Sequence, residues 1–297
     1  MNKQILTRAL RRAQPLAGTF ALLLPLAGCA RASIETVQPR STLLVVVTWN
    51  MHAGRGDFRR LVGDLEAGRL AAGSAENFVV LLQEAAGEDA VRLERLVAER
   101  GWSFFLVPVR HDGRRTRSNA IVSSRPIAGA RAITLPQERQ PRGAAVASIE
   151  VEGHRLFVAS AHLENRVSWW KGGLFSDGAR ARQAEALVAA LPRAGAGILG
   201  ADLNTWLGRH EPAWEVLTRR FDDTPGFPRT STFRSRLVLD HLLFDLPPGW
   251  QAVTHVVGDT YGSDHHPVIA IVFSAGSPTR GVCALGCPSA SSRAAAR

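Results

Sequence analysis

Short apolar runs rich in β-branched residues alternate with segments of helical periodicity throughout residues 42–274. An alternation of this kind fits one α/β domain whose helices lie outside its sheets. Helical spacing is found in Val91–Arg100 and Ala179–Leu191. The runs that we expect to form strands are Leu43–Trp49, Phe78–Leu82, Ala120–Ser123, Ala144–Val151, Leu156–Ala161, Gly197–Leu199, Leu237–Leu239 and Val268–Phe273.

Residues 1–28 have the composition of an export signal, with four basic residues before an apolar run, Pro15–Leu26, that is too short for a comfortable membrane span. The run ends in Leu26-Ala27-Gly28-Cys29, which resembles the lipobox of bacterial lipoproteins. In that family the cysteine is lipidated and becomes the mature N-terminus. We therefore expect an exported protein, anchored in the membrane of the cell envelope by lipid on Cys29 and facing outside the cytoplasm. The alternative is an ordinary signal peptide in which Cys29 is incidental.

The segments that flank the expected domain carry most of the net positive charge. Residues 29–41 are expected to be a tether, and residues 275–297, rich in Gly, Pro, Ser and Ala, a disordered tail. Two alternatives are open for Cys283 and Cys287 of this tail. They form a local disulfide in an oxidising compartment, or they belong to a floppy end that has no catalytic role. The formal net charge is +10, but residues 42–274 contain 27 basic and 25 acidic residues. Net charge therefore does not identify nucleic acid as the partner.

Polar residues suited to acid–base chemistry accompany five of the expected strands. At a strand end such a group is desolvated less than inside a sheet, and sheet packing holds it in place. Taken singly, each is typical of a turn or a solvated strand end. Together they predict a site at one edge of the sheets. The residues are Asn50, Gln83-Glu84, His162, Asp202-Leu203-Asn204 and Ser263-Asp264-His265-His266-Pro267.

Seven short motifs, in the same order along the chain, resemble those of the endonuclease/exonuclease/phosphatase superfamily, the deoxyribonuclease-I-like phosphodiesterases. The resemblance spans residues 42–274 and implies an α/β fold: a four-layer α/β/β/α sandwich of two mixed β-sheets packed face to face, with helices outside. The motifs are Thr48-Trp49-Asn50, Leu82-Gln83-Glu84, Ser118-Asn119-Ala120-Ile121, Ala161-His162-Leu163, Gly200-Ala201-Asp202-Leu203-Asn204, Leu239-Asp240-His241 and Ser263-Asp264-His265-His266-Pro267.

The resemblance implies a metal site. By position Glu84 resembles the family's main metal carboxylate, while Asn50 and Asp264 would complete the surroundings of the ion. Oxygen ligands without a Cys/His cluster suit Mg²⁺, with Mn²⁺ or Ca²⁺ as alternatives, better than zinc.

The resemblance also implies catalytic roles. His265 is similar to the histidine that activates or positions water, and Asp240 to the carboxylate that orients its ring. Asp202 and Asn204 resemble the pair that flanks the scissile phosphate. His162 is similar to the second histidine of the deoxyribonuclease and sphingomyelinase branches, a phosphate ligand or general acid. The implied reaction is metal-assisted, in-line attack of water on a phosphodiester.

Two segments bear on the substrate. Four arginines, Arg110, Arg114, Arg115 and Arg117, precede Asn119 in an expected loop, where they grip a nucleic-acid backbone or are simply solvated. Asn119 is expected to contact phosphate or support Asp202. For the aromatic residues of Trp169–Phe175 we consider three alternatives: they stack on bases, they enter a bilayer interface, or they pack in the core.

We favour a Mg²⁺-dependent nuclease acting on DNA or RNA. A sphingomyelinase-like or other lipid phosphodiesterase, acting on phospholipid head groups at a membrane, is the alternative enzyme. The alternative of another class is a catalytically silent surface binding module, against which the intact set of catalytic residues counts.

Overall fold

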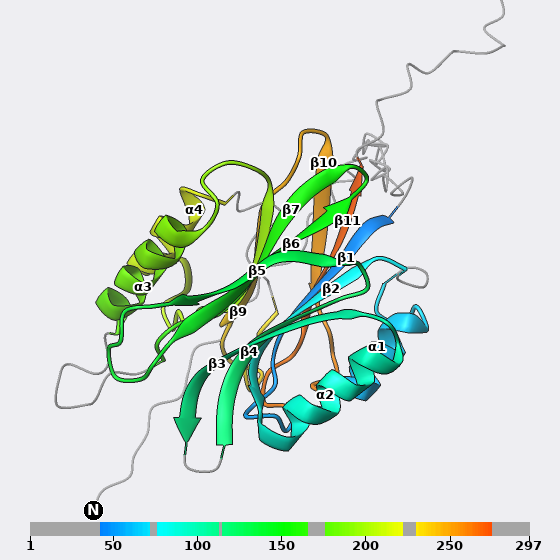
Figure 1. The fold of residues 1–297 in the computed structure, drawn as a ribbon. Coiled ribbons are helices and arrows are strands. Elements are labelled where there is room, and N and C mark those ends of the chain that lie inside the picture. Colours follow the sequence, from blue (N-terminus) through cyan, green and yellow to red (C-terminus); the bar gives the residue numbers. More distant parts are fainter. Residues whose placement is uncertain (1–41, 72–75, 113–114, 166–175, 222–229, 275–297) are drawn as a thin grey trace, which may run out of the picture. The chain divides into compact units, whose positions relative to one another are not determined.

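The computed structural model describes residues 42–71, 76–112, 115–165, 176–221 and 230–274, all of them within one unit of the chain, residues 39–297 (Figure 1). The predicted signal peptide with Cys29, the tether, Arg114, the aromatic segment Trp169–Phe175, and the tail with Cys283 and Cys287 lie outside these residues. In the described part of the chain, no helix has both the length and the apolar character needed to cross a membrane.

Two mixed β-sheets form the body of the structure. In the six-stranded sheet the order is β10-β11-β1-β2-β4-β3, with β1 parallel to β2, and in the five-stranded sheet it is β5-β6-β7-β8-β9, with β7 parallel to β8. The strands are β1 (Thr42–Asn50), β2 (Phe78–Ala86), β3 (Ser103–Asp112), β4 (Arg115–Ser123), β5 (Ile127–Thr134), β6 (Gly143–Val151), β7 (His154–His162), β8 (Gly197–Asp202), β9 (Asp240–Asp245), β10 (Trp250–Val256) and β11 (Val268–Ser274).

Helices cover the outer face of each sheet (Figure 1). The core between α1 (Phe58–Glu66), α2 (Gly87–Glu99) and the six-stranded sheet is separate from the core that joins the two sheets. A third core lies between the five-stranded sheet and the helices α3 (Asp177–Ala190) and α4 (Pro212–Thr218). The predicted four-layer α/β/β/α sandwich of two mixed sheets is therefore confirmed.

The local sequence explains why these elements form. Strands β1 and β2 are covered on both faces, which accounts for their near-continuous apolar runs. Helix α1 begins where the Asp57 carboxylate accepts a hydrogen bond from the Arg60 amide at 3.0 Å, and Leu61, Val62 and Leu65 form its buried face.

The two sheets approach closely beneath the strand ends that carry the polar motifs. Gly200 of β8 has no side chain there, and a Cβ atom would lie 2.8 Å from the Cβ of Thr48 in β1. Beside it, the Gln83 amide donates to Thr48 Oγ1 in its own sheet and to Ser160 Oγ in the other, both at 3.1 Å. This buried amide ties the sheets together just below the site.

Three sequence predictions were wrong in detail. Strand β9 begins at Asp240 rather than covering Leu237–Leu239, so Asp240 opens its strand instead of following one. The arginine segment is a hairpin, because Arg110 lies in β3 and pairs across the ladder with Arg117 of β4. The edge strands β3, β5 and β10 were not expected. β5 lacks a continuous apolar run and is exposed at most positions, whereas β3 contains such a run, Phe104–Val109, and was missed despite it.

Candidate active site

The polar motifs meet because of strand register. β1 ends at Asn50, β7 at His162 and β8 at Asp202. His162 pairs with Asp202 in the parallel β7–β8 ladder, and Asp202 pairs with Asp240 in the antiparallel β8–β9 ladder. Three neighbouring strands of one sheet thus bring three titratable side chains to the same end.

His265 and Asp240 form a buried hydrogen-bonded pair. The ring Nδ1 of His265 lies 2.8 Å from Oδ2 of Asp240. The backbone on both sides of this contact is fixed, because Trp49 Nε1 donates to the His265 carbonyl at 3.1 Å and the Asp240 amide donates to Thr232 Oγ1 at 3.1 Å. An ionised Asp240 assigns the proton to Nδ1 and leaves Nε2 facing the site.

The charge of the pair favours a protonated ring. Burial by itself lowers the pKa of His265, but the carboxylates of Asp240, Asp202 and Asp264 outweigh it and raise the pKa to about 9. In the absence of a bound cation, His265 therefore carries a proton at neutral pH.

Asp202 lies at the centre of the site and is 1% exposed. Its Oδ2 accepts a hydrogen bond from Asn50 Nδ2 at 2.9 Å and lies 3.4 Å from His162 Nε2 and 4.0 Å from His265 Nε2. Its Oδ1 accepts from the backbone amide of Asn204 at 3.0 Å. Burial, followed by the charge of Asp240, raises the pKa of Asp202 to about 7. Asp202 is thus positioned to exchange a proton near neutral pH.

Glu84 projects from a distorted part of β2. The register of β2 against β4 shifts between Leu82 and Ala85, and Glu84 has a φ of 54°, in the left-handed region that residues other than glycine rarely adopt. Its Oε2 accepts from the Ala53 amide at 2.9 Å and lies 2.7 Å from Arg117 Nη1. Backbone strain of this kind is frequent at functional sites, where the surrounding structure holds it in place.

Asp264, the third predicted metal ligand, lies among three basic side chains. Its Oδ1 lies 3.2 Å from His52 Nδ1 and 3.9 Å from His265 Nε2, and its Oδ2 accepts from Arg234 Nη2 at 3.0 Å. His52 belongs to none of the seven motifs, so the sequence did not single it out. Its position two residues after Asn50 was the available signal.

Arg142 is a site residue that the sequence motifs did not reveal. The side chain is 7% exposed, its Nη2 lies 3.6 Å from Glu164 Oε1, and its Nε has no hydrogen-bond partner among the described residues. It lines a small cleft together with Glu84, Arg117 and His162. A buried guanidinium with an unused N–H suits a phosphate oxygen. The signal was its place just before the expected strand Ala144–Val151.

Asn119 also lines this cleft, next to His162. Burial, and then the nearby cations Arg142, His265 and Arg117, lower the pKa of His162 well below its usual value, so the ring is neutral. The amide of Asn119 donates to the Gly143 carbonyl at 2.6 Å, which places it beside the start of β6 rather than against Asp202.

Two groups of side chains are candidates for a divalent cation. In the described residues, the Asp202, Asp240 and His265 ligand atoms lie within 4.8 Å of one another. However, Nδ1 of His265 and Oδ2 of Asp240 already hydrogen-bond to each other, so with this hydrogen bond intact the two side chains would offer a cation only Nε2 and Oδ1. The second candidate is the Glu84 carboxylate, whose charge is balanced by the Arg117 guanidinium in this structure. Its oxygens are the hard donors that Mg²⁺ prefers. The donor chemistry at Glu84 therefore fits the ion.

A four-layer sandwich with this set of side chains at its strand ends defines the deoxyribonuclease-I-like class of folds. Within it, the chain belongs to the Endonuclease/Exonuclease/phosphatase family, whose sequence profile matches residues 47–265. The enzymes of this family use divalent metals. No curated protein matches the chain.

Solved structures of the family have the same fold. An endonuclease/exonuclease/phosphatase from Beutenbergia cavernae gives a TM-score of 0.59 at 20% identity and covers 80% of this chain and 73% of its own. D. rerio TDP2 complexed with a single-strand DNA product gives 0.55 at 18% identity, covering 78% and 99%. The beta toxin of Staphylococcus aureus gives 0.54 at 19% identity, covering 76% and 99%. At these identities the likeness establishes the fold alone.

Proposed function

We propose that this protein is a nuclease that hydrolyses phosphodiester bonds of DNA or RNA with the help of a divalent cation, Mg²⁺ by preference. The observation that carries the proposal is the pairing of two features at one site. The buried Asp240–His265 pair, together with Asp202, can accept and donate protons. The guanidinium of Arg142, beside neutral His162, can bind an anion.

The cation would be held by Glu84 with Asn50 and Asp264, and it supplies charge stabilisation to the phosphoryl oxygens when bound. The remaining chemistry belongs to the chain. His265 takes the proton of the attacking water at Nε2, for which it must first be deprotonated, and Asp240 holds its ring and stabilises the imidazolium that forms. Asp202, 4.0 Å from that nitrogen, is the second acceptor.

Neutral His162 and Arg142 act on the phosphate. One ring nitrogen of a neutral histidine donates a hydrogen bond, so neutral His162 can bind a phosphoryl oxygen, while protonation of the leaving oxygen would first require the imidazolium form of the ring. Asn204, whose amide nitrogen donates to the Leu163 carbonyl at 3.1 Å, holds the turn after β8 in place. Its φ of 50° lies in the left-handed region, like that of Glu84.

A nucleic-acid substrate is supported by Arg117 and Arg142 at the site and by the fold shared with TDP2, which was solved with a single-strand DNA product. A lipid phosphodiesterase remains the second candidate because of the lipobox-like segment at Cys29 and the aromatic segment Trp169–Phe175. A binding module without activity is the candidate of another class.

The place of action that we propose is the cell envelope, outside the cytoplasm, through a lipid on Cys29. Expression of the full chain with a radiolabelled fatty acid tests it, with Cys29→Ser as the comparison. Labelling of the wild type alone supports the anchor, and absence of label from both overturns it.

The experiment that tests the activity presents DNA, RNA and sphingomyelin vesicles to the protein, with Mg²⁺ and with EDTA. We expect EDTA-sensitive cleavage of nucleic acid that His265→Ala lowers and that His255→Ala, a histidine on the edge strand β10, leaves unchanged. Release of lipid head groups with nucleic acid intact would replace the nuclease by the lipid enzyme. Inactivity on all three would leave the binding module.

A further inference from the structure

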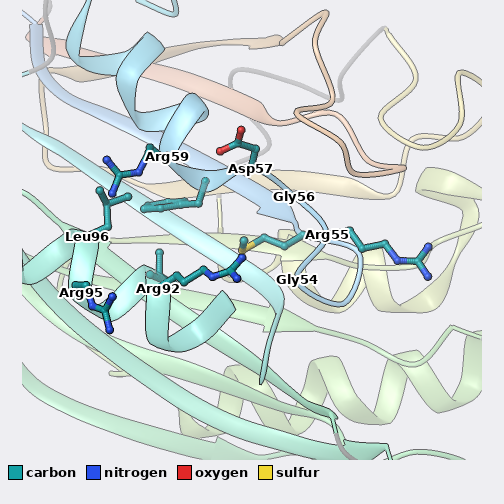
Figure 2. Close-up of a pocket in the computed structure, with 11 residues that line it drawn as sticks. Gly54, Arg55, Gly56, Asp57, Arg59, Arg92, Arg95 and Leu96 are labelled. Atoms are coloured by element: carbon teal, nitrogen blue, oxygen red, sulfur yellow. The ribbon is translucent and has the colours of Figure 1, made fainter. Parts of the chain in front are cut away.

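A second cleft, separate from the catalytic one, lies between the loop that follows β1 and helix α2. It encloses about 460 Å³. We propose that this cleft binds a nucleotide unit of the substrate strand outside the scissile linkage. The inference rests on the proposed nuclease function and adds to it a preference for polymeric substrates over small phosphodiesters. Figure 2 shows the residues that line the cleft.

The cleft combines an apolar floor with a basic rim. The floor consists of buried side chains, and the four rim arginines are exposed. The lining contains one acidic residue, Asp57, whose carboxylate is already engaged as the cap of α1. The floor residues are Met51, Phe58, Leu93 and Leu96, and the arginines are Arg55, Arg59, Arg92 and Arg95.

This concentration of charge is local. Residues 42–274 contain 27 basic and 25 acidic residues, so a lining with four arginines and one carboxylate departs from the average of the domain. One of the four, Arg59, also lies at 3.8 Å from the exposed Glu99 carboxylate, beyond the lining. A ligand that matches both parts of the cleft carries negative charge next to a flat apolar group. A nucleotide has this combination, with its phosphate for the guanidinium groups and its base for the apolar floor.

The arginines come from both walls. In Figure 2, Arg92 of α2 extends toward the loop at Gly54, while Arg59 of α1 lies above Leu96. Arg55 and Arg95 point outward at opposite sides of the cleft. Arg59 and Arg92 are therefore the pair that we place nearest to a bound phosphate.

The loop between β1 and α1 connects this cleft with the catalytic site. Met51 lines the cleft, and its amide donates to the Gln83 carbonyl at 2.8 Å. Two residues further on, the Ala53 amide donates to Glu84 Oε2 at 2.9 Å. One short loop thus lines the cleft on one side and touches the proposed metal ligand on the other. A nucleic-acid strand bound at Glu84 would cross this loop to place a neighbouring nucleotide in the cleft.

A lipid surface fits this part of the molecule less well. A membrane-binding face presents several large apolar side chains together. In the described residues the exposed large apolar side chains are Val91, Leu207 and Val253, which lie on α2, after β8 and on β10. Among them, Val91 alone is near the cleft, next to Arg92. The rim is therefore basic rather than apolar.

The test measures binding of a labelled single strand of about twelve nucleotides and of a dinucleotide by fluorescence anisotropy, in EDTA and over a range of salt concentrations. The variant is Arg59→Gln with Arg92→Gln. The matched control, Arg155→Gln with Arg219→Gln, removes two exposed arginines from β7 and the end of α4. Thermal unfolding of each variant verifies that it is folded.

We expect the cleft variant to bind the long strand about tenfold more weakly, with a slope of log K against log salt that is smaller by about 0.7 for each lost phosphate contact. The control should match the wild type, and affinity for the dinucleotide should change less than affinity for the long strand. A cleft variant with wild-type affinity and slope, in a protein that cleaves nucleic acid with Mg²⁺, overturns this inference and leaves the nuclease intact.

Two other outcomes count against the inference. A wild-type protein that neither binds nor cleaves nucleic acid overturns the nuclease and the cleft together. Loss of binding to phosphatidylserine vesicles in the cleft variant, with oligonucleotide affinity unchanged, assigns the arginines to a lipid surface instead.

Discussion

Replacement of Asp240 by Asn removes the charge that holds His265 in its protonated form, with little change in side-chain volume. In the wild type without metal, the pKa of His265 is raised from 6.5 to about 9. At about 1.4 kcal/mol for each pKa unit, this corresponds to roughly 3 kcal/mol in favour of the imidazolium. Since burial lowers the pKa of His265 and persists in the variant, whereas only the carboxylates of Asp202 and Asp264 remain to raise it, we expect Asp240→Asn to bring this pKa clearly below 9.

The sign of the effect on stability follows from linkage. The pKa of His265 is higher in the folded chain than in the unfolded chain, so the stabilisation is complete below pH 6.5 and is lost as the pH rises through about 9. The wild type should therefore lose stability over this interval, and Asp240→Asn should show less of the loss. An asparagine amide also donates to Nδ1, which moves the ring proton to Nε2 and should lower kcat about 10²–10⁴-fold.

The assay is an NMR titration of the histidine ring signals in EDTA, together with urea unfolding at several pH values. Asp245→Asn, at the far end of the same strand and paired with Arg220 near the surface, is the matched control. A His265 pKa that stays near 9 in Asp240→Asn would refute the reasoning.

Three further predictions concern separate parts of the structure. His265→Ala should lower turnover about 10²–10⁴-fold while far-UV circular dichroism stays unchanged, and wild-type turnover would remove it from the mechanism. Gly200→Ala should destabilise the fold by about 1–3 kcal/mol in urea unfolding, because its Cβ would lie 2.8 Å from Thr48 Cβ, and an unchanged midpoint would contradict the close sheet contact. Tyr261→Phe removes a 2.8 Å hydrogen bond to Asp64, whose pKa is lowered first by Arg69 and then by Tyr261. Its cost, about 1 kcal/mol at neutral pH, should shrink as the pH falls below 3.8 and through the lowered pKa of Asp64, where the carboxylate becomes protonated, and a cost that is the same at all pH values would count against it.

The pattern of apolar runs predicted the central strands and an α/β domain, while the four-layer sandwich followed from the resemblance of the seven motifs to the family. β1, β2, β7 and β8 are buried on both faces and read as apolar runs with polar residues at their ends. Edge strands such as β5 carry no such run and are set by the neighbour they pair with, here β6. Helix α1 was missed although its signal was present, since Asp57 precedes apolar residues at helical spacing.

For the site, the sequence indicated which strand ends carry polar residues, and the structure brings Asn50, Asp202, Asp240 and His265 together. The partners of these residues could not be derived in the same way. Arg142 reaches the site through the register of β6 on β7, and that register depends on packing across the whole sheet. The contact of Arg117 with Glu84 likewise depends on the bulge in β2, which no sequence pattern marked.

The most direct test of the account is a Mg²⁺ titration of nucleic-acid cleavage by the wild type and by Glu84→Gln, with Glu94→Gln on the exposed face of α2 as control. The substitution keeps the size of the Glu84 side chain and removes its charge. We predict that the half-saturating Mg²⁺ concentration rises at least about tenfold in Glu84→Gln, because even the residues that only support a metal ligand contribute on this scale, and stays at the wild-type value in the control. Cleavage by the wild type that persists in EDTA, or a Mg²⁺ titration that is unchanged in Glu84→Gln, would contradict it.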